Sequence, residues 1–282
     1  MQITVIPNLH SAETEALFSR VCAQLTASGA TVVTATSAGG LPTAEEIAAS
    51  LKGSAAVVAV GGDGTIVHVA KAAATVGCPV LGINGGHLGF LAGLEKDELS
   101  LLSALLSGEY TVEERTLLRL TLRTADGARE YRAMNEAVIS RGALSQLVDL
   151  HILQEEREIF AYRGDGVILA TPTGSTAYSL SAGGPVVSPQ VDCLLMTPVC
   201  PHTVASRAQV LPADAVLRIE ASALDGGEAF LTVDGEKNAA LAAGDSVTVS
   251  RAPEVARLIR LKSATFYDVL NRKIYGKEGK NP

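Results

Sequence analysis

The sequence of 282 residues is poor in aromatic side chains, which make up 4% of the chain and include no tryptophan. Hydrophobic residues nevertheless reach 47%, so we expect a sizeable core built from Ala, Val, Leu and Ile. Basic residues are scarce as well: the chain has 23 Lys and Arg and 30 Asp and Glu, which gives a net charge of −7. With no basic cluster, this balance argues against a surface that binds nucleic acid.

The four cysteines form no Cys-x-x-Cys pair, and no His/Cys cluster has zinc spacing. We expect all four to be free thiols of the core: Cys22, Cys78, Cys193 and Cys200. No apolar run reaches the roughly 20 residues that a membrane span needs. The chain opens on a strand-like segment at 3–6 rather than on a signal peptide. These absences predict a cytoplasmic protein that does not contact a membrane.

One stretch carries the strongest chemical signal. The apolar run Val57–Val60 leads into Gly-Gly-Asp-Gly-Thr at positions 61–65, and an Ala-rich segment follows. This pattern predicts a buried strand, a glycine turn and a helix whose N-terminus favours phosphate. Asp63 itself repels phosphate, so it fits a base for a hydroxyl or a metal ligand, unless it merely caps the helix. The stretch predicts a phosphotransferase.

Two halves of the chain differ in their hydrophobic period. Residues 1–110 alternate short apolar runs with helix-forming stretches, which predicts an α/β domain with a parallel, Rossmann-like sheet. The expected strands are 3–6, 31–34, 55–60 and 79–83, and the expected helices are 14–28, 43–51, 65–75 and 97–106.

Residues 111–256 instead alternate with period two, which predicts a β-rich domain, a β-sandwich of antiparallel strands. Turn pairs separate the expected strands: Asp126-Gly127, Asp225-Gly226, Asp234-Gly235 and Gly244-Asp245. A strand at 256–261 and a helix at 266–274 follow. We expect this tail, residues 257–282, to return to the first domain. A cleft between the two domains is the default position for a ligand.

Two polar stretches of the second half do not fit a plain β-domain. Asn135 and Glu136 stand side by side at the start of an apolar strand. The segment 164–185 contains Thr-Pro-Thr-Gly-Ser at 171–175, and Tyr178 is its one aromatic residue. Hydroxyl, amide and carboxylate groups can bind a purine edge or a ribose, and a tyrosine can pack on a flat ring.

These motifs, with Asn84–Leu91 and Pro198–Thr203, occur in the order seen in bacterial NAD kinases, and the chain resembles that family over nearly its whole length. Gly-Gly-Asp-Gly is shared with diacylglycerol kinases, sphingosine kinases and phosphofructokinases, whereas Thr-Pro-Thr-Gly-Ser-Thr-Ala-Tyr is much more specific. The resemblance implies phosphorylation of the 2′-hydroxyl of the adenosine ribose of NAD, which gives NADP. It also implies ATP or polyphosphate as donor, a divalent metal such as Mg²⁺, and a homodimer or homotetramer.

The resemblance also implies roles for individual residues, with Asp63 as the general base. The implied NAD-binding residues are Asp63, Gly64, His68, Asn135, Glu136, Arg163, Asp165, Thr176, Ala177, Tyr178 and Ser181. The implied phosphate-donor loop comprises Gly61, Gly62, Thr65, Asn84 and Gly85. No metal ligand is assigned.

Blander readings stay open for several of these positions. His68 and Arg163 can be plain surface residues, Tyr178 a core residue, and the turn at 84–89 an ordinary βα loop. Relatives often have Gln where this chain has Glu236, and some have a basic residue in place of Gly85. We therefore assign no binding role to Glu236, and the choice of donor stays open.

Two other functions compete with the NAD kinase hypothesis. A lipid or sphingoid kinase shares the Gly-Gly-Asp-Gly-Thr motif, but the second half has nucleotide-binding rather than apolar motifs. A catalytically silent NAD(H) sensor is the other candidate, although a sensor has no use for a base such as Asp63. Formation of NADP from NAD and ATP separates all three.

Overall fold

The structure is a computed structural model that describes residues 1–37, 40–86, 89–142, 147–203, 206–223, 228–263 and 265–276. It divides into two compact units. The first unit comprises Met1–Arg115 and the segment from Glu254 onward, and the second comprises Thr116–Pro253. Strands β6 (Thr111–Thr124) and β17 (Ser246–Arg260) each run from one unit into the other.

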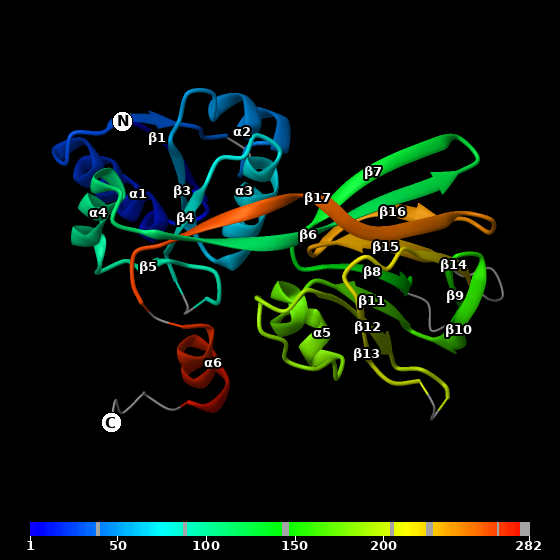
Figure 1. The fold of residues 1–282 in the computed structure, drawn as a ribbon. Helices are drawn as coiled ribbons and strands as arrows, with labels where there is room; N and C mark the ends of the chain where they lie inside the picture. The colour runs from blue at the N-terminus through cyan, green and yellow to red at the C-terminus, as the bar shows by residue number, and fades with distance from the viewer. Residues whose placement is uncertain are drawn as a thin grey trace. The chain divides into compact units, whose positions relative to one another are not determined.

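The first unit is a parallel sheet flanked by helices (Figure 1). Its strands pair in the order β2-β1-β3-β4, and the end of β17 joins β4 in parallel through Leu258 and Val80. The strands are β1 (Gln2–Pro7), β2 (Thr31–Thr34), β3 (Ala56–Gly61), β4 (Val80–Asn84) and β5 (Leu94–Glu95). The helices are α1 (Ala12–Ala27), α2 (Ala44–Ser50), α3 (Asp63–Ala74), η1 (Leu99–Leu101), α4 (Leu102–Ser107) and α6 (Phe266–Tyr275).

Burial on both faces explains why β3 reads as an unbroken apolar run. Every residue of β3 is buried, as expected for a parallel strand that helices cover on two sides. Val58 and Val60 share a core with Leu17 of α1 and Leu102 of α4. On β4, a Cβ added to Gly82 would overlap Ile66 of α3, so a glycine is required for α3 to pack closely.

The C-terminal helix α6 packs back on the first unit, as the sequence predicts. Its N-terminus is fixed by a capping box between Thr265 and Asp268. The Phe266 ring lies against the Phe90 ring, with their centroids 6.4 Å apart. Leu270 is buried.

The second unit is built from two sheets, in agreement with the predicted β-rich domain. One sheet contains β6, β7, the first half of β17, β14, β9 and β10, and the other has the order β13-β12-β11-β8-β15-β16. The remaining elements are β7 (Gly127–Ala133), β8 (Glu136–Arg141), β9 (Val148–Gln154), β10 (Arg157–Gly164), β11 (Gly166–Ala170), η2 (Thr173–Thr176), α5 (Tyr178–Ser181), β12 (Cys193–Val199), β13 (Gln209–Pro212), β14 (Leu217–Ala223), β15 (Ala229–Val233) and β16 (Glu236–Leu241).

Alternate side chains along a strand of the second unit belong to two different cores. On β11, Val167 and Leu169 join the main core together with residues of the other sheet, such as Leu120 and Ile152. The alternate residue Ile168 belongs to a second, smaller core. The two sheets therefore pack as a sandwich, and the second core covers the outer face of one of them.

Several local expectations need correction. Residues 246–260 form one continuous strand with Pro253 inside it, so the strand expected at 256–261 does not begin separately. The helix expected at 97–106 is a 3₁₀ turn followed by the short helix α4. All four cysteines are free, but Cys200 is exposed rather than in the core. The predicted turn Asp225-Gly226 lies outside the described residues. In the part of the chain that the structure describes, no helix has the length and apolarity needed to span a bilayer.

Candidate active site

The glycine turn lies at the carboxyl edge of the parallel sheet, between β3 and α3. Gly62 precedes the helix without a side-chain cap, and Asp63 is the first helical residue. The first turn of a helix leaves backbone N–H groups without intrahelical partners. Gly62 and Gly64 are exposed, and nothing lies within 4 Å of a Cβ built on either one. The loop therefore presents backbone to an open space.

Asp63 is held in place by backbone N–H groups of the segment after β4. The N–H of Phe90 donates to Oδ2 at 2.8 Å, and the N–H of Leu91 donates to Oδ1 at 3.1 Å. The ammonium of Lys273, from α6, lies 3.7 Å from Oδ2. The side chain remains 30% exposed, so this fixed carboxylate is accessible.

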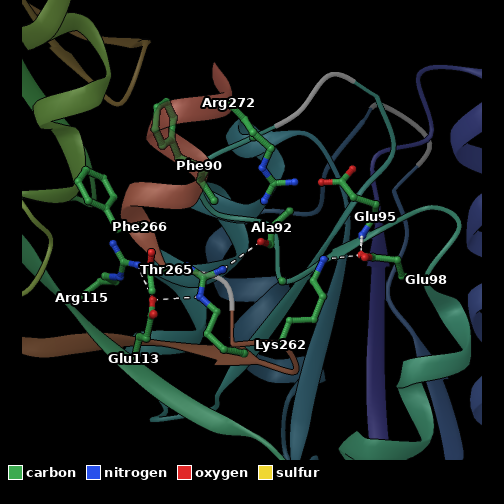
Figure 2. Close-up of a pocket in the computed structure, with 14 residues that line it drawn as sticks. Phe90, Ala92, Glu95, Glu98, Glu113, Arg115, Lys262, Thr265, Phe266 and Arg272 are labelled. Carbon is green, nitrogen blue, oxygen red and sulfur yellow. Dashed lines mark hydrogen bonds and ion pairs between the residues drawn. The ribbon is translucent and has the colours of Figure 1, made fainter. Parts of the chain in front are cut away.

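A partly buried arginine fixes the segment that holds Asp63. Arg260, on β17, donates through Nη1 to the carbonyl oxygens of Leu91 at 2.9 Å and Ala92 at 3.0 Å. Its Nε donates to Glu113 at 3.0 Å, and Glu113 also pairs with Arg115. Figure 2 shows Glu113 beside Arg115, and both residues line a cavity of about 90 Å³ together with Arg260. Arg260 thus holds in place the segment whose backbone N–H groups bind the Asp63 carboxylate.

Gly89 is required by the position of Asp63. A Cβ on Gly89 would overlap the Asp63 carboxylate. We expect Gly89→Ala to displace Asp63 and lower kcat by about 10²-fold, because a misplacement of about 1 Å is enough for such a loss. Steady-state kinetics measure the loss, and Gly86→Ala is the matched control, since nothing lies within 4 Å of a Cβ built there. Equal kinetics for the two variants would contradict the expectation.

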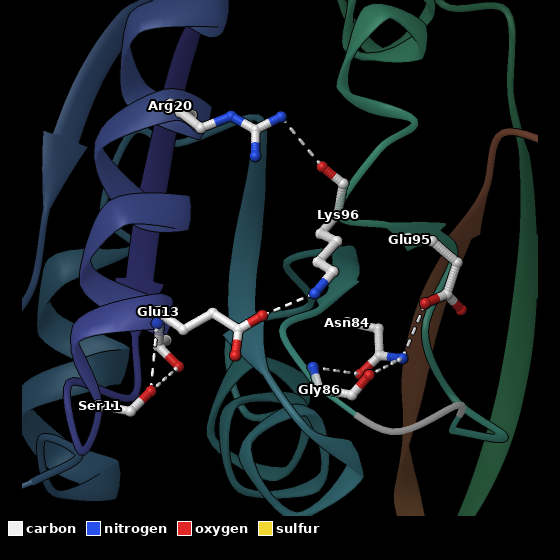
Figure 3. Close-up of polar contacts among 8 residues, drawn as sticks. Ser11, Glu13, Arg20, Asn84, Gly86, Glu95 and Lys96 are labelled. Carbon is white, nitrogen blue, oxygen red and sulfur yellow. Dashed lines mark hydrogen bonds and ion pairs between the residues drawn. The ribbon is translucent and has the colours of Figure 1, made fainter.

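The second glycine turn is held by Asn84, which is buried at the end of β4. Its Oδ1 accepts the N–H of Gly86 at 3.1 Å, and its Nδ2 donates to Glu95 at 2.8 Å (Figure 3). The N–H of Gly85 donates to the carbonyl of Gly61 at 3.2 Å. The two glycine turns are therefore hydrogen-bonded to each other. His87 and Leu88 lie outside the described residues.

Two predicted residues of α3 point into the fold rather than outward. Thr65 is 3% exposed, and its hydroxyl accepts a hydrogen bond from Asn8 at 3.2 Å. A Cβ on Gly61 would overlap that hydroxyl. His68 Nε2 lies 2.8 Å from the carbonyl oxygen of Pro42. The side chains of Thr65 and His68 thus shape the loop and its surroundings.

In the second unit, the Thr-Pro-Thr-Gly run wraps around the backbone of 134–135. The hydroxyl of Thr171 donates to the carbonyl of Met134 at 2.6 Å, and the N–H of Thr171 donates to that of Asn135 at 2.9 Å. A Cβ on Gly174 would overlap the Asn135 carbonyl. The structure therefore brings the Asn-Glu and Thr-Pro-Thr-Gly motifs together, and these contacts require the hydroxyl of Thr171 and the missing side chain of Gly174.

Asp234 is the residue that organises this contact. It accepts hydrogen bonds from the N–H groups of Met134, Asn135 and Glu136 at 2.9, 2.8 and 3.0 Å. Its own backbone has φ of 47°, which aspartate tolerates better than most residues. Asp234 and Gly235 separate two strands in the sequence. The Asp234 side chain thus also binds the backbone N–H groups at the start of β8, which begins with Glu136.

Glu136 is a buried carboxylate with unused hydrogen-bonding capacity. It is 6% exposed, and among the described residues nothing hydrogen-bonds its Oε2. Burial, together with the nearby charge of Asp234, raises the pKa of Glu136 to about 7, against the backbone N–H of Tyr178, which favours the charged form. An unpartnered buried acceptor is costly, so a ligand that donates to it is favoured.

The other predicted residues of this unit fall into two groups. Thr176, Ala177, Tyr178 and Ser181 follow one another along η2 and α5, and Tyr178 is 45% exposed rather than in the core. Asp165 instead accepts a hydrogen bond from Arg141 at 2.6 Å. Arg163 pairs with Asp149 across β10 and β9. Asp165 and Arg163 are thus engaged in ion pairs.

Four residues that make contacts in these sites were not predicted from the sequence: Phe90, Leu91, Asp234 and Lys273. The N–H groups of Phe90 and Leu91 carry no residue-type signal, because any residue except proline supplies them. Asp234 had a turn signal but no signal for its three acceptor contacts. Lys273 could have been singled out from the sequence, because it is a charged residue at the next position of the apolar stripe of α6.

Potential metal ligands do not cluster in the described part of the chain. No group of three or more His, Cys, Asp or Glu side chains suited to a metal ion occurs within the described ranges. Mg²⁺ is commonly held by one or two carboxylates together with substrate phosphates. The residues present therefore fit a metal that arrives with a phosphate donor, and they do not form a protein cage.

Comparisons with known proteins give the same family for both halves of the chain. The family model described as the ATP-NAD kinase N-terminal domain matches residues 3–110, and the one described as the ATP-NAD kinase C-terminal domain matches residues 134–261. The NAD kinase of Symbiobacterium thermophilum is 50% identical over 222 residues, 78% of either chain. The NAD kinase of Moorella thermoacetica is 45% identical over 224 residues, 79% of this chain and 71% of that protein.

Two solved structures share the fold. A yeast NADH kinase complexed with NADH matches with a TM-score of 0.85 and 26% identity, over 100% of this chain and 89% of that one. An Archaeoglobus fulgidus NAD kinase in complex with ATP matches with a TM-score of 0.73 and 23% identity, over 98% of each chain. With both domain models matched in one chain and relatives at this level of identity, the chain belongs to the NAD kinase family.

Proposed function

We propose that the enzyme transfers the γ-phosphoryl group of ATP to the 2′-hydroxyl of the adenosine ribose of NAD, with Asp63 as the general base. Family membership makes the chain an NAD kinase; the donor, the metal and the residue roles are the proposal. The observation that carries it is the fixed carboxylate of Asp63, held by the N–H groups of Phe90 and Leu91 beside the glycine turn.

Asp63 is suited to its role by its position and accessibility. The carboxylate is at the first residue of α3 and is 30% exposed. A base of this kind accepts the hydroxyl proton while the ribose oxygen attacks phosphorus. Gly62 and Gly64 leave space for the donor phosphates beside the helix N-terminus, where positioning and charge stabilisation account for most of the catalysis.

The second unit is proposed to bind the nucleoside of NAD. Glu136 offers its unpartnered Oε2 to ribose hydroxyl groups, which are donors. Asn135 supplies an amide, and the exposed ring of Tyr178 supplies a flat apolar surface for the adenine. Thr176, Ala177 and Ser181 complete this segment, whereas the ion-paired Asp165 and Arg163 need to exchange their present partners to bind the substrate.

Mg²⁺ is proposed to enter as the complex with ATP, since the described residues form no metal cage. Bound to the phosphates, the metal neutralises charge on the transferring group. The yeast relative is described with NADH and the archaeal one with ATP, which supports these substrate classes. Polyphosphate as an alternative donor, a homodimeric or homotetrameric assembly, and a cytoplasmic location belong to the same proposal.

The direct test is to incubate the full chain with NAD, Mg²⁺ and either ATP or polyphosphate. We expect NADP with ATP, detected by an NADP-specific dehydrogenase. NADP formed with polyphosphate but not with ATP would overturn the assignment of ATP. No NADP with either donor would overturn the proposed reaction and favour an NAD(H)-binding sensor. A lipid or sphingoid kinase predicts phosphorylation of a sphingoid base instead, and that substrate is included as a control.

A further inference from the structure

The inward face of the C-terminal helix ends in a lysine. Phe266, Val269 and Leu270 are spaced as i, i+3 and i+4, which places them on one face of α6. Lys273 occupies the next position of that stripe, i+7. Binary patterning favours an apolar residue at this position of an inward stripe.

The ammonium of Lys273 is directed to the candidate base. Its Nζ lies 3.7 Å from Oδ2 of Asp63 and 4.4 Å from the centroid of the Phe90 ring. The two ionised side chains are 35% and 30% exposed, and a pair so open to solvent contributes little to stability. The packing of Phe266 on Phe90 already docks the helix. Stability therefore does not account for Lys273.

A role in phosphoryl transfer accounts better for the position of Lys273 beside Asp63. Negative charge on the phosphoryl oxygens must be balanced in the transition state, but the glycine turn supplies backbone groups and one carboxylate. Among the described residues, the cation within ion-pair distance of Asp63 is Lys273. Its flexible four-carbon stem lets the ammonium move by a few ångströms, and the Phe90 ring offers a surface over which it can rest.

We propose that Lys273 is a second catalytic residue, whose ammonium leaves Asp63 and binds an oxygen of the transferring phosphoryl group. This proposal rests on the role proposed for Asp63. In the step, the 2′-O–H bond breaks and its proton passes to Asp63. The ribose oxygen forms the new bond to the γ-phosphorus, and the bond to the bridging oxygen breaks with its electron pair on ADP. Lys273 neutralises the phosphoryl oxygens and is not consumed.

The test compares Lys273→Met, Lys273→Arg and the neighbouring Arg272→Met in the full chain. We expect Lys273→Met to lower kcat by about 10²–10³-fold, as for loss of one charge-stabilising donor, with an unchanged Tm and an unchanged KM for NAD. Lys273→Arg keeps the charge and retains most of the activity. Arg272→Met removes one charge from the same helix but has no contact with Asp63 among those described, and we expect wild-type kinetics.

A merely structural role gives a different pattern. Equal kinetics for Lys273→Met and Arg272→Met would overturn the proposal, and so would Lys273→Arg as inactive as Lys273→Met. If Lys273→Met fails to fold, Lys273→Ala with added propylammonium decides: recovery of kcat supports the proposal, and no recovery opposes it. Asp63→Asn is assayed in parallel. Loss of turnover in Asp63→Asn but not in Lys273→Met refutes this inference alone, whereas full turnover in Asp63→Asn refutes the proposed base.

Discussion

Replacement of Asp63 by asparagine is expected to lower kcat for NADP formation by about 10²–10⁴-fold, the usual contribution of a general base. Asparagine has nearly the same size but cannot accept the 2′-hydroxyl proton. The Kd for NAD should stay close to the wild-type value, because the proposed nucleoside contacts come from the second unit. Steady-state kinetics and isothermal titration calorimetry measure the two quantities.

The amide also changes the local hydrogen bonds, so a control is needed. Both carboxylate oxygens of Asp63 accept backbone N–H groups, and asparagine offers one oxygen for the two. A Tm measurement separates this structural loss from the chemical one. Asp97→Asn, at an exposed position of the same unit, is the matched control and should retain wild-type turnover. Near-wild-type kcat in Asp63→Asn would rule out Asp63 as the base.

Replacement of Glu136 by glutamine is expected to weaken NAD binding by about 10–10²-fold above pH 8, since hydrogen bonds to a charged group contribute roughly 1.5–3 kcal/mol. With its pKa raised to about 7, wild-type Glu136 gains charge, and acceptor strength, as pH rises from 6 to 8. The Kd of the wild type should therefore fall over this range, and that of Glu136→Gln should not. Calorimetric titrations with NAD at several pH values test this difference.

The same pKa predicts the pH dependence of stability in the absence of NAD. The pKa of Glu136 is raised from 4.5 to about 7 in the folded state, so folding favours the protonated form. This contribution destabilises the wild type progressively from pH 4.5 to 7 and then levels off, at about 3 kcal/mol for a shift of this size. We expect Glu136→Gln to be more stable than the wild type at pH 8 and equal to it near pH 4. The opposite order at pH 8 would contradict the burial of an unpaired carboxylate.

The sequence was informative where the local pattern decides the structure. The apolar run before Gly61 predicted β3 because a strand covered on both faces has no polar alternation, and the following turn and α3 came with it. The sequence pattern also predicts a separate strand at 256–261, whereas β17 continues through Pro253 to Arg260. Proline lacks an N–H, but strands tolerate it where that group is not needed for the ladder.

The candidate site was less predictable because its contacts are distant in the chain. Asp63 is fixed by Phe90 and Leu91, and Arg260 donates in turn to the carbonyl oxygen of Leu91. The first two contacts come from backbone N–H groups, and the third comes from a guanidinium near the other end of the sequence. Glu136 could be singled out by the motif, but its burial and its unpartnered oxygen depend on how Asp234 and the start of α5 fold around it.

The most direct measurement is a crystal structure of Asp63→Asn with NAD, Mg²⁺ and a non-hydrolysable ATP analogue. The account predicts the ribose 2′-oxygen within hydrogen-bond distance of the residue 63 side chain, roughly 2.6–3.2 Å, and in line with the γ-phosphorus. A 2′-oxygen bound to another side chain, with residue 63 away from the reacting atoms, would contradict it.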